Sequence, residues 1–283
     1  KELMRFLSYI SNMTKNLDNF GLKSIADNYD LFFIDLWGVV HNGIKLYEDS
    51  IEVLDNLSKA KKNFILLTNA PRPNESVINF LKKIGLKKYF ENVFTSGEAA
   101  HKYLISELSK KKFFHIGPPK DYDLFKNIEK NNVLNIEDSD YLLCTGLFEN
   151  HENDLKYYKN LFSKHISKKM ICTNPDLIVD RGEIREFCAG SVAKSFEEIN
   201  GKVLYFGKPY PPVYNISTNV LNKKVLCIGD NLNTDIKGAN LQNFDSLLIT
   251  HGVHRQEIME TELNQVIKKY EVSVDYTQEN LKW

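Results

Sequence analysis

Short apolar runs that end in a polar residue recur along the chain. Residues 31–34 are four apolar residues, rich in aromatic and branched side chains, and Asp35 follows them directly. A run of this kind is typical of a β-strand buried on both faces, as in a parallel sheet. Asp35 alone would suit the cap of a following helix equally well, but the pattern is repeated. Three more such runs end in Thr68-Asn69, in Gly207-Lys208-Pro209 and in Gly229-Asp230.

Segments with helical spacing of apolar residues alternate with these runs. One of them, at residues 51–57, precedes the run at 64–67, and another, at residues 77–84, follows it. Such alternation predicts an α/β fold with a doubly wound parallel sheet and right-handed crossovers. Ligands of an open parallel sheet bind just outside the carboxyl ends of the strands. We therefore expect the four polar strand ends to form one site.

The strand ends also suggest how the chain divides into domains. Strand candidates at 113–116, 141–144, 170–172 and 177–179 end in no comparably useful group. We predict a core domain made of residues 1–96 and 190–283, with an α/β cap domain inserted at residues 97–189. This division places Asp35 and Lys208 in the same compact domain. Residues 1–30 are expected to be a helical lead-in, because apolar residues share one helix face there: Leu3, Phe6, Leu7 and Ile10.

The composition argues against some partners and favours one compartment. Lysine plus arginine and aspartate plus glutamate both number 37, so nothing indicates binding to nucleic acid or to a membrane surface. No apolar run has the length of a membrane span, and the N-terminal residues lack a signal-peptide core. The four cysteines are scattered and form no C-x-x-C pair, which is typical of reduced, buried thiols in a cytoplasmic protein.

The polar strand ends supply the groups needed for phosphoryl transfer. Asp35 and Asp230 are hard oxygen ligands, and two carboxylates together with water and a phosphate oxygen suit Mg²⁺. With the cation neutralising charge, Asp35 could attack phosphorus and form an aspartyl-phosphate intermediate. Thr68 and the backbone N–H of Asn69 are candidates for holding the phosphate, and Lys208 for balancing its charge.

The same residues resemble the motifs of a known superfamily. Motifs one to four of the haloacid dehalogenase superfamily are similar, in order, to Asp35-x-Trp37-Gly38-Val39, Thr68-Asn69, Gly207-Lys208-Pro209 and Gly229-Asp230-x-x-x-x-Asp235. The long gap between the second and third motifs, with Asn174-Pro175-Asp176 and Gly190-Ser191, resembles class IIA, the NagD-like and p-nitrophenyl phosphatase-like enzymes. Two segments further resemble an uncharacterised bacterial branch of that class: Asn69-Ala70-Pro71-Arg72 and Ser96-Gly97-Glu98.

The resemblance implies a Mg²⁺-dependent phosphatase with a HAD-like, Rossmannoid core. Its substrate would be a small phosphorylated metabolite such as a sugar phosphate or an aryl phosphate. The implied residues are Asp35, Thr68 and Lys208 for catalysis; Thr68, Asn69, Asn174 and Asp176 for substrate binding; Asp35, Asp230 and the backbone carbonyl of Trp37 for the metal; and Asp235 for support of the metal ligands. A homodimer through the cap is the macromolecular partner that we expect.

Trp37 departs from the family pattern. Family phosphatases usually carry a second Asp at this position, which protonates the leaving group and then activates water, and tryptophan cannot transfer that proton. Positioned acid–base catalysis is typically worth about 10²–10⁴-fold in rate. The second hypothesis is therefore a catalytically weak protein that binds a phosphorylated ligand or partner on the same scaffold.

The histidines near these motifs leave two further alternatives open. His41, six residues after Asp35, is a candidate substitute for the missing acid, although another role in its loop suits it better. His251 and His254 are two potential zinc ligands, but no further spaced ligands accompany them. A zinc site is therefore the weaker hypothesis for this pair.

Overall fold

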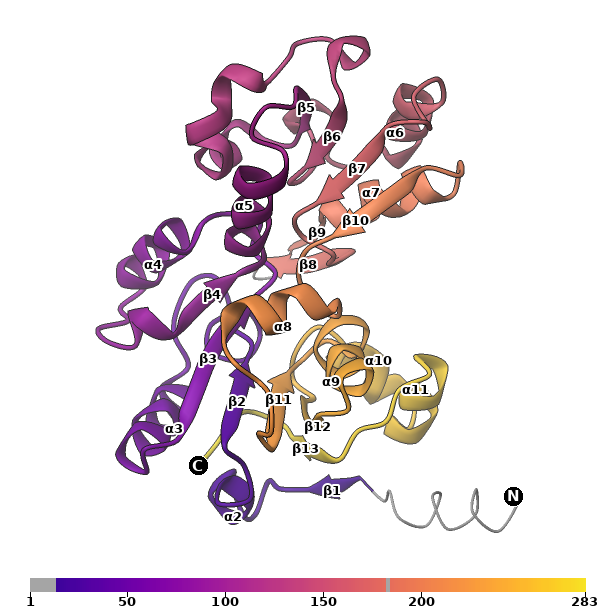
Figure 1. Ribbon diagram of the computed structural model, residues 1–283. Helices are drawn as coiled ribbons and strands as arrows, with labels where there is room; N and C mark the ends of the chain where they lie inside the picture. Colours follow the sequence, from indigo (N-terminus) through magenta and orange to yellow (C-terminus); the bar gives the residue numbers. More distant parts are fainter. Residues whose placement is uncertain (1–13, 182–183) are drawn as a thin grey trace. The chain divides into compact units, whose positions relative to one another are not determined.

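The computed structural model describes residues 14–181 and 184–283, and its helices and strands are labelled in Figure 1. The lead-in helix expected at residues 3–10 lies outside the described residues. The first described elements are the short strand β1 (Lys15–Asn16) and the helix α2 (Lys23–Ala26). The chain divides into two compact units, one made of Lys1–Leu66 and Val220–Trp283 and the other of Leu67–Asn219.

A parallel sheet forms the centre of the first unit. Ile34 and Ile228 lie opposite each other on two neighbouring strands, so the carboxyl ends of these strands are adjacent. All four residues of the strand that precedes Asp35 are buried, as the apolar run predicted. The parallel α/β fold class is therefore confirmed. The described strands of this unit lie in the order β1, β13 (Tyr276–Gln278), β12 (Asp245–Ile249), β11 (Val225–Gly229), β2 (Leu31–Ile34) and the first part of β3 (Asn63–Thr68).

Helices and one π-helical turn complete the first unit. Leu232 and Ile236 of the π-helical turn pack in one apolar cluster with Leu248 of β12 and Val266. This cluster anchors the turn, which follows the end of β11 closely. The helical elements are α3 (Glu48–Lys59), the π-helical turn η5 (Leu232–Ile236), α9 (Lys237–Gln242), α10 (Arg255–Glu260) and α11 (Leu263–Lys269).

The second unit has a parallel sheet of its own, in the order β10 (Lys202–Tyr205), β7 (Lys169–Cys172), β6 (Tyr141–Cys144) and β5 (Phe113–Ile116). An antiparallel hairpin, β8 (Ile178–Arg181) and β9 (Ile184–Phe187), precedes α7 (Ala189–Glu197). Tyr158, Phe162 and Phe196 are fully buried in the apolar cluster of this unit. Its other elements are α4 (Asn74–Lys83), η1 (Phe90–Asn92), β4 (Val93–Thr95), α5 (Ser96–Glu107), η2 (Pro119–Asn131), η3 (Ile136–Asp138), η4 (Glu149–His151), α6 (Leu155–Phe162) and α8 (Pro211–Ser217).

The strand that leads to Lys208 lies in a different sheet from the one predicted. β10 pairs with β7, and Val203 and Tyr205 pack against the apolar cluster that contains Phe196 of α7. Asp35 and Lys208 consequently belong to different compact units, contrary to expectation. The units meet in sequence at 66/67 and 219/220, whereas the predicted limits are 96/97 and 189/190. A division into compact units does not by itself locate a cap domain, so the cap at residues 97–189 stays a prediction.

The cysteines agree with the expectation from their spacing. All four cysteines are free and buried. Burial raises the pKa of the Cys172 thiol to about 12, so this thiol stays protonated at neutral pH. In the part of the chain that the structure describes, no helix combines the length and the apolar character needed to cross a membrane.

Candidate active site

Three buried aspartates meet at the carboxyl ends of β2 and β11. Asp35 directly follows β2, and its backbone N–H donates to the carbonyl of Ile228 on β11 at 2.9 Å. Asp230 directly follows β11, and Asp235 lies in η5. One oxygen of each carboxylate lies within 4.8 Å of one oxygen of the other two, and the residues are 8%, 6% and 3% exposed. Buried carboxylates this close repel one another unless a cation or protons balance them, and hard oxygen donors suit Mg²⁺.

Two glycines leave space for the side chain of Asp230. Gly38 adopts a φ of +79°, and a Cβ on Gly38 or on Gly252 would lie 2.1 Å from Asp230 Oδ2. The N–H of Val253 donates to the same oxygen at 2.8 Å. A hydrogen bond to a charged oxygen is stronger than one between neutral groups, so it favours the ionised carboxylate in this orientation. The sequence reasoning identified Asp230 but missed Gly252 and Val253.

Asp235 is fixed by the segment that carries it, residues 229–236, which we call the aspartate loop. The N–H of Asn231 donates to Asp235 Oδ2 at 3.1 Å, and Asn231 Oδ1 accepts from the N–H of Asn233 at 2.9 Å. A Cβ on Gly229 would lie 2.0 Å from Asp235 Cγ. π-helical turns such as η5 are frequent at functional sites. The aspartate loop thus orders two of the three carboxylates.

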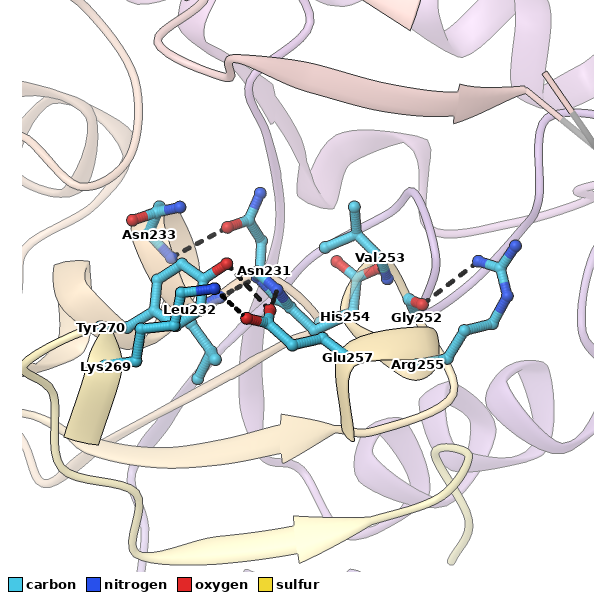
Figure 2. A network of polar contacts seen from close by, with 11 residues as sticks. Asn231, Leu232, Asn233, Gly252, Val253, His254, Arg255, Glu257, Lys269 and Tyr270 are labelled. Atoms are coloured by element: carbon cyan, nitrogen blue, oxygen red, sulfur yellow. Dashed lines mark hydrogen bonds and ion pairs between the residues drawn. The ribbon is translucent and has the colours of Figure 1, made fainter. Parts of the chain in front are cut away.

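A polar network connects the aspartate loop to α10 and α11 (Figure 2). His254 Nε2 accepts a hydrogen bond from the N–H of Leu232 at 3.2 Å, and its Nδ1 lies 3.3 Å from Glu257 Oε2. The hydroxyl of Tyr270 donates to Glu257 Oε2 at 3.0 Å, and the ammonium of Lys269 contacts the other oxygen of this carboxylate. The pair of His254 and Glu257 is local, three residues apart. No pattern in the sequence signalled the other contacts, because they join residues 12 to 22 positions apart.

The zinc hypothesis for His251 and His254 gains no support. Among the described residues, the three aspartates are the group whose atoms are close enough to bind one ion, and neither histidine belongs to it. His251 is exposed, and its Nδ1 lies 3.4 Å from Asn280 Nδ2.

The indole of Trp37 packs inside its own loop. Its ring lies edge-on to the ring of His41, with 5.1 Å between centroids, and a Cβ on Gly43 would lie 2.6 Å from the indole. His41 is 2% exposed, and its Nδ1 accepts from the N–H of Gly43 at 2.9 Å. Burial lowers the pKa of His41 to about 4, so the ring is neutral at pH 7 with its proton on Nε2. A neutral imidazole is a poor proton donor, which favours a structural role for His41.

Tyr47 and Arg255 are neighbours of Asp230 that the sequence reasoning also missed. Burial raises the pKa of Tyr47, the charge of Asp230 raises it further, and Arg255 lowers it. Arg255 donates its Nη1 to the carbonyl of Gly252 at 3.3 Å (Figure 2). Both residues therefore add to the electrostatic surroundings of the aspartate group.

The other expected site residues lie in the second unit. Asn69 Nδ2 donates to Asp176 Oδ1 at 3.0 Å and to the carbonyl of Lys208 at 2.9 Å, and its Oδ1 accepts from the N–H of Lys208 at 2.7 Å. The ammonium of Lys208 donates to the carbonyl of Leu67 at 3.0 Å. Asn174 Oδ1 accepts from the N–H of Asp176 at 3.0 Å. This unit thus joins Asn69, Lys208 and Asp176, and Thr68 precedes Asn69 at the end of β3.

Comparison with known proteins identifies the family. Residues 32–130 match the family model described as haloacid dehalogenase-like hydrolase, and residues 205–277 match a second model, described as HAD-hydrolase-like. A solved structure of a haloacid dehalogenase-like hydrolase from Brucella suis is 32% identical in sequence and has a TM-score of 0.75. The match covers 83% of this chain and 93% of that chain. The chain belongs to the haloacid dehalogenase-like hydrolases.

Curated relatives specify the class within this family. The chain is 25% identical to phosphoglycolate phosphatase 1A of Arabidopsis thaliana, over 89% of this chain and 76% of that protein. It is 23% identical to the ribonucleotide monophosphatase NagD of Escherichia coli, over 77% of this chain and 86% of NagD. This haloacid dehalogenase-like hydrolase is thus a class IIA member, as its motifs predicted.

Proposed function

We propose that this hydrolase is a Mg²⁺-dependent phosphatase that acts on a small phosphorylated metabolite, such as a sugar phosphate or an aryl phosphate. The buried group of Asp35, Asp230 and Asp235 carries the proposal, because three carboxylates with oxygens within 4.8 Å of one another need a cation to stay ionised together. The names of the Arabidopsis and Escherichia coli relatives, a phosphoglycolate phosphatase and a ribonucleotide monophosphatase, support a phosphate monoester as the substrate.

In this proposal Asp35 is the nucleophile. Its carboxylate attacks phosphorus, the leaving group departs with the ester oxygen, and water then hydrolyses the aspartyl phosphate. Mg²⁺, held by Asp35, Asp230 and the carbonyl of Trp37, would supply the positive charge that reduces repulsion between the carboxylate and the phosphate. Asp235 would orient the aspartate loop through its hydrogen bond with the N–H of Asn231.

Thr68, Asn69 and Lys208 are proposed to hold the phosphoryl group. The hydroxyl of Thr68 and the backbone N–H of Asn69 are donors, and the ammonium of Lys208 balances negative charge. The Asn69 side chain has a different task, because both hydrogens of its amide already bind Asp176 and the Lys208 carbonyl. Asn174 and Asp176 are proposed to contact the rest of the substrate.

One observation favours the alternative, a protein that binds a phosphorylated ligand or partner and hardly turns it over. Trp37 occupies the position of the proton donor, and the nearby His41 is neutral because burial lowers its pKa to about 4. Burial raises the pKa of the Tyr47 phenol, and the charge of Asp230 raises it further, which makes this hydroxyl a weaker acid. Turnover should therefore be easiest to detect with a leaving group that needs no proton, and its presence or absence there separates the two hypotheses.

The decisive experiment is hydrolysis of p-nitrophenyl phosphate, with Mg²⁺ and with EDTA, by the protein and by Asp35→Asn. The asparagine keeps the size of Asp35 but cannot act as the nucleophile. We expect Mg²⁺-dependent turnover that the variant loses by at least about 10³-fold while its circular dichroism is unchanged. Equal rates for the two proteins across aryl, acyl and sugar phosphates would instead support the binding hypothesis.

A further inference from the structure

The aspartate loop has a backbone donor that its own turn cannot satisfy. The first N–H groups of a helical turn have no partner within that turn. In η5, the N–H of Asn233 is capped by Asn231 Oδ1 at 2.9 Å, which leaves the N–H of Leu232 to an outside acceptor. That acceptor is His254 Nε2 at 3.2 Å, and Leu232 is fully buried while His254 is 9% exposed. The hydrogen bond therefore cannot be replaced easily by bulk water.

The contact with Leu232 fixes the proton of His254. A backbone N–H can only donate, so Nε2 must carry the lone pair and the proton of the neutral ring must lie on Nδ1. Nδ1 faces Glu257 Oε2 at 3.3 Å, where a carboxylate accepts that proton's hydrogen bond. Burial opposes ionisation of Glu257, but hydrogen bonds from Lys269, Tyr270 and His254 lower its pKa, so it remains a carboxylate at neutral pH. The edge-on ring of Tyr270, 4.8 Å from that of His254, also limits rotation of the imidazole.

The segment that carries His254 contacts the aspartate loop at a second point. The N–H of Val253 donates to Asp230 Oδ2 at 2.8 Å, and the backbone of Gly252 approaches the same side chain closely. Residues 252–254 thus hold Asp230 through the N–H of Val253. They also hold the start of η5, the turn that carries Asp235, through His254 and the N–H of Leu232 (Figure 2).

We propose that His254 is a positioning residue for the metal site, which sets the spacing of Asp230 and Asp235 by accepting the Leu232 N–H, with Glu257 holding the imidazole in the required tautomer. This inference rests on the Mg²⁺ site of the proposed function but not on phosphatase turnover. Groups that orient the ligands of a metal typically change its affinity by about 10–100-fold when they are lost.

The test measures Mg²⁺ binding without substrate, through the rise in melting temperature as Mg²⁺ is added. His254→Leu removes the acceptor while filling similar volume, and His254→Gln can return a carbonyl oxygen to the position of Nε2. We expect His254→Leu to raise the half-saturating Mg²⁺ concentration about 10-fold or more, and His254→Gln to restore most of the loss. Glu257→Ala, at a partly exposed position where the fold should survive, is expected to weaken Mg²⁺ binding several-fold. Its matched control is Glu260→Ala, which removes an exposed carboxylate from the same helix and should leave the half-saturating Mg²⁺ concentration unchanged.

Three results would overturn the proposal. One is a loss of stability in His254→Leu with unchanged half-saturating Mg²⁺, which would make the residue merely structural. Another is equal weakening in His254→Leu and His254→Gln, since the acceptor would then be irrelevant. The third is the absence of any Mg²⁺ effect on the unmodified protein, which would remove the metal site itself. A normal Mg²⁺ response with the expected ranking of variants, but no hydrolysis of any phosphate ester, would support this proposal while rejecting the proposed phosphatase function.

Discussion

Trp37 replaces a side chain that could exchange protons with one that cannot. If the general acid is missing, the cost must depend on how strongly the leaving group needs a proton. An aryl or acyl phosphate releases a fairly stable anion, whereas an alkyl or sugar phosphate releases a strongly basic alkoxide. We therefore predict measurable turnover of p-nitrophenyl or acetyl phosphate and at least about 10²-fold slower turnover of an alkyl phosphate, as measured by phosphate release.

Trp37→Asp should reduce this difference in turnover rate between aryl or acyl phosphates and alkyl phosphates. Gly43 lies against the indole, so the smaller side chain leaves a cavity and stability should fall. Melting temperatures must therefore accompany the rates. Rapid hydrolysis of an alkyl phosphate by the unmodified protein would show that another residue donates the proton.

His41 is the nearest candidate for that other residue, and its surroundings argue against the role. Because its pKa is lowered to about 4, His41 is neutral from about pH 5 upward, and Nδ1 is occupied by the Gly43 N–H. His41→Asn can keep an acceptor at the position of Nδ1. We predict that this variant changes kcat for p-nitrophenyl phosphate by less than about 3-fold and leaves the pH–rate profile between pH 5.5 and 8 unchanged. A folded variant with a loss of about 10²-fold or more would instead assign the proton transfer to His41.

At the scale of elements, the approach of the 252–254 segment to Asp230 depends on the lack of a side chain at Gly252. A methyl group there would lie 2.1 Å from Asp230 Oδ2, well inside van der Waals contact. Gly252→Ala should therefore displace the carboxylate and weaken Mg²⁺ binding by about 10-fold or more, as measured from the Mg²⁺-dependent melting temperature.

Gly21 provides the matched control for this variant. A Cβ on Gly21 would lie 2.0 Å from the backbone oxygen of Trp283, a clash of similar severity that involves none of the three aspartates. Gly21→Ala should lower the melting temperature without Mg²⁺ and leave the half-saturating Mg²⁺ concentration as it is. If Gly252→Ala and Gly21→Ala weaken Mg²⁺ binding to the same extent, then general loss of stability, rather than displacement of Asp230, explains both.

The elements also show which features the sequence could predict. Buried strands with polar ends are visible locally, so β2, β11 and the aspartates that follow them were predictable from short runs of residues. The partner of a strand is not visible locally: the run that became β10 would look the same in either sheet, and its pairing with β7 depends on packing against α7. The support of Leu232 by His254 has the same origin, because a hydrogen bond across 22 residues leaves no periodic signal.

For the whole molecule, the two units differ in what they offer a cation. Asp35, Asp230 and Asp235 all lie in the unit made of Lys1–Leu66 and Val220–Trp283, whereas Lys208 and Asn69 lie in Leu67–Asn219. A ligand stabilises the state that binds it by RT ln(1 + [L]/Kd), about 2.7 kcal/mol at 100 times Kd. Amide hydrogen exchange should therefore show where that stabilisation is located.

We predict that Mg²⁺ alone, without phosphate, slows exchange in peptides that cover β2, the aspartate loop and residues 250–258. Peptides of β6 and β7 should exchange as before, because their unit contributes none of the three carboxylates. Asp230→Ala should abolish the protection in the first unit, since it removes a ligand that both the Val253 N–H and the two neighbouring glycines hold in place. Protection that survives in Asp230→Ala, or that appears only in the sheet of β5, β6, β7 and β10, would locate the cation elsewhere. In that case protonation would have to relieve the repulsion among the three aspartates, and Asp35 could not be an ionised nucleophile at neutral pH.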